Sequence, residues 1–120
     1  MPAPKIQISK AVSAKPLING LPGGQLLDLA SFPELGEQMV AGVYRNLGTE
    51  PAFDVDSYPE HEFKYVTDGE LAVEEAGQRL VATTGDLIYI PKGSKFRILP
   101  TVFTAIYFSA RVPQFTSSTL

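Results

Sequence analysis

The sequence predicts an all-β domain, because short strand-like segments alternate with turns along most of the chain. Ten glycines and ten prolines punctuate its 120 residues. From residue 39 onward they separate short apolar segments, and no long stretch repeats its apolar residues with the helical period. The best helical candidate, residues 32–39, is short. Short strands at regular spacing with glycine and proline turns are typical of a β-sandwich or barrel.

The expected strands follow one another at short intervals. Turn residues at 21–24 precede a short apolar run at residues 25–30. Asp68-Gly69 is a strong tight-turn signal, and Pro91–Ser94 predicts another turn. The expected strands cover residues 39–47, 53–58, 60–67, 70–74, 79–83, 86–90, 95–99 and 102–110.

The length fits one domain. Residues 1–16 contain three prolines and little periodicity, so we expect an extended arm, either a loose tail or an edge strand on a partner. Residues 17–112 form the expected barrel, and residues 113–120 are a polar tail.

The composition excludes several kinds of site. The chain has no cysteine and one histidine, His61. This excludes disulfides, structural thiolate zinc sites, iron–sulfur clusters and cysteine nucleophiles, and also any site that needs several imidazoles from one chain.

The charge balance favours neither nucleic acid nor membrane as a partner. Ten basic against thirteen acidic residues give a net charge of −3. No basic stripe supports nucleic-acid binding, and no apolar run is long enough for a membrane span. No apolar core follows the N-terminal lysines, so we expect this segment not to be a secretory signal and the protein to be cytoplasmic.

Two spaced motifs carry the most information. The first places Glu62 and Gly69 seven residues apart, and the second joins Gly85 to Pro91 and Gly93. This skeleton resembles the two signature motifs of the cupin superfamily, over about residues 40–110. The resemblance implies a double-stranded β-helix, or jelly-roll, barrel whose mouth can hold one ligand.

Within the superfamily, the chain is similar to small single-domain cupins of the ethanolamine-utilisation EutQ-like type. The similar segments are Glu62–Gly69, Gly85–Ser94 and the aromatic pair Tyr107-Phe108. The resemblance implies a fold and a cavity more than a reaction. It also implies a homodimer that pairs or exchanges N-terminal strands, for which the arm is suited.

The residues at the metal positions of the superfamily depart from its pattern. Asp56, Tyr58 and Phe96 stand where the resemblance implies three histidines, and only the glutamate remains, at Glu62. We therefore expect no cofactor. An alternative set of oxygen-rich ligands for magnesium, manganese or a similar divalent ion consists of Asp56, Glu60 and Glu62, with His61 joining only at a bulge.

Strand alternation predicts which side chains face the cavity. If Glu62 points inward, then Tyr58, Glu60 and Lys64 do so too, while His61 and its alternate neighbours point outward. Carboxylates close together in a partly dry pocket raise each other's pKa, and a lysine opposes this rise. The predicted catalytic residues are Glu62, Lys64, Glu60 and Tyr58, and the predicted cavity-lining residues are Asp56, Tyr44, Tyr89, Phe96 and Tyr107.

Three functions remain open from the sequence. The leading one is metal-free acid–base catalysis on a small polar metabolite, as in a lyase or isomerase, with Glu62 as the base, Lys64 tuning it or holding a carboxylate, and a tyrosine as the acid. The second is a divalent-metal enzyme with carboxylate ligands. The third is a non-catalytic ligand sensor or dimeric scaffold, in which the charged residues form an inert ion-pair network.

Overall fold

The computed structural model describes residues 8, 10, 15–21, 24–31, 39–112 and 114. The helical candidate, apart from Met39, and most of the arm and tail lie outside this part of the chain. The described residues form strands and no helix. The strands are β1 (Ile18–Leu21), β2 (Gly24–Ser31), β3 (Val40–Leu47), β4 (Phe53–Val55), β5 (Glu62–Glu75), β6 (Gln78–Thr83), β7 (Leu87–Ile90), β8 (Phe96–Ile98) and β9 (Val102–Ser109).

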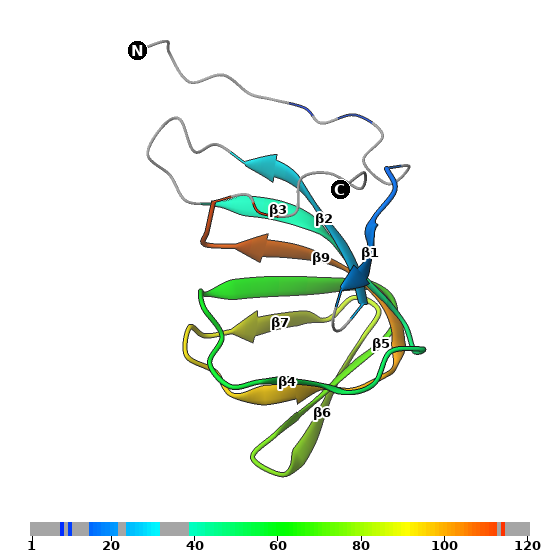
Figure 1. The fold of residues 1–120 in the computed structure, drawn as a ribbon, viewed down its shortest axis with the longest axis vertical. Coiled ribbons are helices and arrows are strands. Elements are labelled where there is room, and N and C mark those ends of the chain that lie inside the picture. The colour runs from blue at the N-terminus through cyan, green and yellow to red at the C-terminus, as the bar shows by residue number, and fades with distance from the viewer. Residues whose placement is uncertain are drawn as a thin grey trace.

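The strands pair antiparallel into a curled sheet that confirms the predicted jelly-roll barrel (Figure 1). Its order is β1-β2-β3-β9-β5-β8-β4, with β6 and β7 also paired to β5. The first half of β5 pairs with β7 and β9, and its second half pairs with β6 and β8. Strand β5 therefore joins the two halves of the barrel.

The predicted turn at Asp68-Gly69 is wrong, because β5 runs through it. Gly69 has φ +82°, and the β5–β9 register shifts between Val66 and Asp68. This irregularity is a β-bulge, which bends a strand without ending it. A side chain at Gly69 would meet the carbonyl oxygen of Val102 at 2.2 Å. The strand needs a glycine here because it bends and because β9 passes close by. The Asp-Gly pair therefore marks a bend within one strand and not a chain reversal.

The other strand predictions agree with the structure except at a few boundaries. The expected strand at residues 53–58 is the shorter β4, and the segments at 60–67 and 70–74 are merged into β5. The sequence predicts no strand at residues 18–21, where β1 forms. No helix in the described part of the chain has the length and apolar character to cross a membrane.

Alternation along β5 and β9 separates the core from the outer surface. On β5, Glu62, Lys64 and Val66 are buried, whereas Phe63 and Tyr65 are exposed. This is the alternation that the sequence predicts. On β9 the buried set is Phe103, Ala105, Tyr107 and Ser109. The buried side chains of these and other strands form one apolar core. It consists of Val40, Tyr44, Val66, Leu71, Ala82, Ile90, Phe96, Ile98, Phe103, Ala105 and Tyr107.

Substituting Gly69 tests the bulge. Gly69→Ala should lower the free energy of unfolding by about 3 kcal/mol, because it adds both backbone strain and a clash. Gly77 is the matched control, since it has φ +78° but no atom within 4 Å of an added Cβ. Gly77→Ala should cost only about 1 kcal/mol. Equal losses in urea denaturation would contradict the close-approach argument.

Candidate functional site

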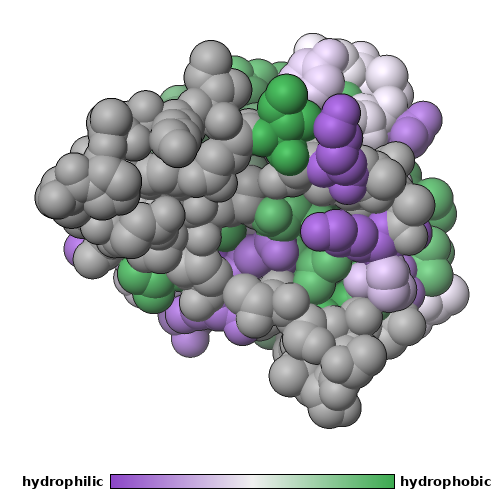
Figure 2. Space-filling model, turned by 90° about the horizontal axis from the view of Figure 1, so that it is seen from above, coloured by the Kyte–Doolittle hydropathy of each residue, from purple (hydrophilic) through white to green (hydrophobic). Residues whose placement is uncertain are grey.

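A cavity of about 300 Å³ opens between the two halves of the barrel. We call it the central cavity. Hydrophilic and hydrophobic surfaces lie side by side on the molecular face in Figure 2. The cavity is lined by Leu26, Tyr44, Phe53, Val55, Tyr58, Pro59, Glu60, Glu62, Lys64, Phe96, Ile98, Tyr107, Arg111 and Gln114.

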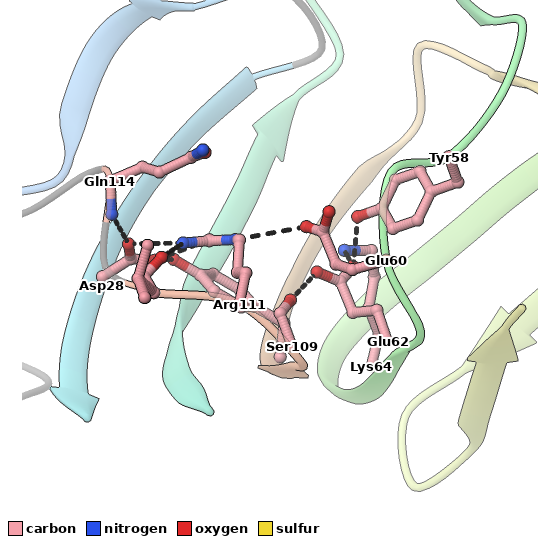
Figure 3. Close-up of polar contacts among 10 residues, drawn as sticks. Asp28, Tyr58, Glu60, Glu62, Lys64, Ser109, Arg111 and Gln114 are labelled. Carbon is pink, nitrogen blue, oxygen red and sulfur yellow. Dashed lines mark hydrogen bonds and ion pairs between the residues drawn. The ribbon is translucent and has the colours of Figure 1, made fainter. Parts of the chain in front are cut away.

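The Glu62 carboxylate is at the centre of the first polar network (Figure 3). Its side chain is 3 % exposed. The Tyr58 hydroxyl donates to Oε2 at 2.6 Å, the Lys64 ammonium donates to the same oxygen, and the Ser109 hydroxyl donates to Oε1. Glu62 and Lys64 share a face because they are two residues apart on β5, and Ser109 is the register partner of Glu62 on β9.

Lys64 is enclosed as well as paired. Its Nζ lies 5.0 Å from the centre of the Tyr44 ring and 5.5 Å from that of Tyr107. Aromatic faces attract a cation at these distances. A carboxylate and two rings therefore compensate for much of the hydration that this buried ammonium has lost.

A second polar network joins Asp28, Arg111 and Glu60. Both terminal nitrogens of Arg111 donate to Asp28 at 2.8 Å, and its Nε lies 3.2 Å from Oε1 of Glu60. Tyr107 donates its hydroxyl to Asp28, and the backbone N–H of Gln114 donates to the same carboxylate at 2.8 Å. Strand β2 and the segment after β9 thus contribute to the site (Figure 3).

The environment shifts several pKa values. Burial raises the pKa of Glu60, Arg111 opposes this rise, and the charge of Glu62 adds to it. Burial raises the pKa of Tyr58, and the charge of Glu62 and its hydrogen bond act in the same direction. Burial alone would lower the pKa of Arg111, but the hydrogen bond and charge of Asp28 outweigh burial and raise it. Glu60 is therefore a carboxyl group whose titration moves toward neutral pH.

Most of the predicted site residues meet at the central cavity. It is lined by Tyr44, Tyr58, Glu60, Glu62, Lys64, Phe96 and Tyr107.

Two predicted lining residues lie elsewhere. Asp56 is exposed on the surface because β4 ends at Val55, before the chain returns to the cavity. Tyr89 is 50 % exposed, and its hydroxyl lies 2.9 Å from Nδ1 of His61. Neither residue lines the central cavity, which corrects the prediction. Tyr89 does border a smaller pocket of about 80 Å³, which Tyr44, Lys64 and Phe96 also line. Strand parity places Tyr89 opposite Phe63 on the outer face.

Asp28, Ser109, Arg111 and Gln114 were not predicted as site residues. Two of them carry a signal in the sequence. Asp28 interrupts the apolar run around Leu27, and Ser109 continues the inward alternation of β9. Arg111 follows the last strand, and no motif or periodicity in the sequence marks it as a site residue. Its role depends on where the chain turns after β9.

The residues present do not fit a metal ion of the cupin type. At the three positions where the resemblance implies histidines, Asp56 is exposed, Tyr58 donates to Glu62, and Phe96 has no ligand atom. His61 is exposed, and its Nδ1 accepts the backbone N–H of Lys92. The structure therefore does not bring together the alternative carboxylate ligands and His61. In the described ranges, no three His, Cys, Asp or Glu side chains are grouped to hold a metal.

The curled antiparallel barrel with a ligand-sized cavity has the cupin fold. A RmlC-like cupin from Shewanella frigidimarina superposes with a TM-score of 0.65 over 83 % of this chain and 86 % of its own, at 17 % identity. At this identity the likeness concerns the fold alone.

The chain belongs to the family of ethanolamine utilisation protein EutQ, whose family model matches residues 23–110. The Clostridium difficile EutQ protein shares 30 % identity and a TM-score of 0.63, over 73 % of this chain and 62 % of its own length. An ethanolamine utilization protein Q from Salmonella typhimurium LT2 shares 30 % identity, with a TM-score of 0.59 over 73 % of this chain and 69 % of its own. No curated protein matches the sequence.

Removing Asp28 should destabilise the fold. Asp28→Asn leaves the Arg111 charge without its buried partner, and we expect a loss of about 3 kcal/mol in unfolding free energy. The control is Asp54→Asn, which breaks the exposed pair with Arg97. Surface pairs contribute little, so the control should unfold close to the wild type in a denaturant titration. Similar losses in both variants would rule out a special role for the buried network.

Proposed function

We propose that the central cavity binds a small polar metabolite and transfers a proton on it without a metal ion. The observation that carries this proposal is the buried Tyr58–Glu62–Lys64 cluster beside Glu60 in a cavity of about 300 Å³. Ligand sites of this size are mostly apolar and contain a few convergent polar groups. Titratable groups with shifted pKa values in a cavity favour acid–base chemistry.

In this proposal the base is Glu60, and not Glu62 as the sequence predicts. Glu62 already accepts hydrogen bonds from Tyr58, Lys64 and Ser109, so it acts as a positioning residue. Glu60 lines the cavity, and its raised pKa brings it closer to the range in which general bases are effective at neutral pH.

The proposed reaction moves one proton between carbon atoms or eliminates a group. The Glu60 carboxylate takes a proton from a carbon next to a carbonyl group of the ligand. In an isomerase reaction that carbon also bears a hydroxyl group, and the proton returns to the former carbonyl carbon while the hydroxyl proton passes to the carbonyl oxygen. In a lyase reaction the electron pair of the broken C–H bond forms a carbon–carbon double bond, and a group on the next carbon, on the side away from the carbonyl group, departs with its own electron pair. The family is named for ethanolamine utilisation, which supports a ligand of a few non-hydrogen atoms.

A thermal-shift screen of small metabolites tests the proposal. A ligand should raise the melting temperature of the wild type. The Glu62→Gln and Lys64→Met variants should lose most of that rise, whereas Glu70→Gln, on an exposed carboxylate of β5, should keep it. A rise retained in the two cavity variants would contradict binding at this site.

The same screen separates the alternatives. Dialysis against a chelator should leave the ligand-induced rise unchanged, and a rise that returns only with magnesium or manganese would favour the carboxylate-metal enzyme. Binding without turnover would favour a ligand sensor.

We propose in addition that a second copy of the chain covers the outer face of β5, β7 and β9. Five large side chains of this outer apolar face are between 42 % and 59 % exposed. They belong to neighbouring register pairs around Phe63, and the next outward positions, Thr67 and Ile106, are uncharged. The five are Phe63, Tyr65, Leu87, Tyr89 and Phe108.

This face suits a symmetric dimer, because it brings no like charges together. Half-exposed side chains of this size offer roughly 400 Å² of accessible surface in total. This is about half of the area that one partner buries in a stable interface. The surrounding rim would supply the rest. The alternative route, strand pairing through the arm, involves residues that are mostly outside the described part.

Sedimentation at micromolar concentration tests the dimer. The wild type should sediment as a dimer and Phe63→Glu as a monomer, because two copies would place charges against each other. Val81 on β6 is the matched control, being 44 % exposed like Phe63, and Val81→Glu should remain dimeric. A monomeric wild type would overturn this assignment.

A further inference from the structure

We infer that the ligand of the central cavity carries a protonated amine and that Glu60 is the group that receives it. This inference rests on the proposed function, because it names the class of molecule that the same cavity binds. It follows from how the donors and acceptors around the cavity are already used.

Arg111 is engaged at each of its side-chain nitrogens. Both terminal nitrogens donate to Asp28, one of them also donates to the carbonyl of Val112, and Nε faces Glu60. An anionic ligand would have to displace one of these contacts. Because the Asp28 side chain is 1 % exposed, displacing it would leave a buried carboxylate unpaired, which is costly.

Lys64 is also engaged. Its ammonium donates to Glu62 and lies over the rings of Tyr44 and Tyr107. A ligand carboxylate or phosphate that bound Lys64 would compete with the buried Glu62 carboxylate. Neither cation of the cavity is therefore available for a negatively charged ligand without breaking a buried pair.

The acceptors are used unequally. Asp28 accepts from two Arg111 nitrogens, the Tyr107 hydroxyl and the Gln114 backbone. Glu62 accepts from three side chains. Within the described part of the chain, Glu60 pairs with Arg111 alone, through Oε1. Its other oxygen is the acceptor that a ligand can use (Figure 3).

The formal charges agree with this assignment. Asp28, Glu60 and Glu62 bring three negative charges, and Lys64 and Arg111 bring two positive ones. A ligand ammonium would balance the remaining charge. Asp28 neutralises much of the repulsion from Arg111, and the rings of Tyr58 and Phe96, packed 5.6 Å apart, line the same cavity for the apolar part of the ligand.

This charge balance makes ligand binding depend on pH. The groups that act on Glu60 are Arg111, Glu62 and Lys64, with Tyr58 and Asp28 one contact further away. Burial raises the pKa of Glu60, so this carboxyl group keeps its proton to higher pH than an ordinary glutamate does. An ammonium prefers the ionised form, and its affinity should rise with pH while the amine stays protonated.

Calorimetry with matched ligands tests the inference. The first set is 2-aminoethanol, 1,2-ethanediol and glycolate, which have similar size and are cationic, neutral and anionic. The second is benzylamine, benzyl alcohol and benzoate, which have a larger body. In at least one set the amine should bind about tenfold more tightly than its neutral and anionic counterparts, a preference of about 1.4 kcal/mol.

Variants locate the binding group. Glu60→Gln should weaken amine binding about tenfold and flatten the rise of its affinity with pH. Glu70→Gln should change neither. The wild-type ligand series and pH profile test the inference even if Glu60→Gln does not fold.

The outcomes separate this inference from the proposed function. Preferential binding of glycolate or benzoate, or of a neutral ligand, overturns the amine assignment and leaves small-molecule binding in place. Failure of both amines to bind also overturns it. In that case a ligand found by the metabolite screen would preserve the proposed function. A screen that finds no ligand would contradict both the proposed function and the amine assignment.

Discussion

The buried ion pair between Glu62 and Lys64 is the interaction on which the rest of the site depends. Two charges inside a small barrel lose hydration, and their mutual attraction offsets this loss only when further hydrogen bonds complete the pair. Tyr58 and Ser109 supply these bonds, and two aromatic rings surround the ammonium. The chain before β5, strand β3 and strand β9 must therefore converge on this pair.

Strand β5 makes that convergence possible. Its first half carries the ion pair, and its second half pairs with the opposite side of the barrel. The bend at Gly69 lets one strand serve both halves without a chain break. Gly69 itself does not line the cavity.

The second network explains how a histidine-poor cupin keeps a polar cavity. Asp28 and Arg111 form a buried bidentate pair, a geometry that gives both strength and orientation. Arg111 then extends to Glu60 at the cavity wall. The central cavity is thus lined by carboxylates, a lysine and aromatic rings. Among the carboxylates Asp28, Glu60 and Glu62, Glu60 has the fewest donors from the described residues.

The sequence by itself determined the all-β barrel and the inward face of β5, because turn residues and period-two alternation are local signals. It also placed Tyr58, Glu60, Glu62 and Lys64 together, since they are close along the chain. Only the tertiary structure decided that Asp28, Ser109 and Arg111 join them, that Asp56 and Tyr89 do not, and that Gly69 bends a strand. Those contacts join residues as many as 83 positions apart, and such pairing depends on strand order and register, which no local pattern encodes.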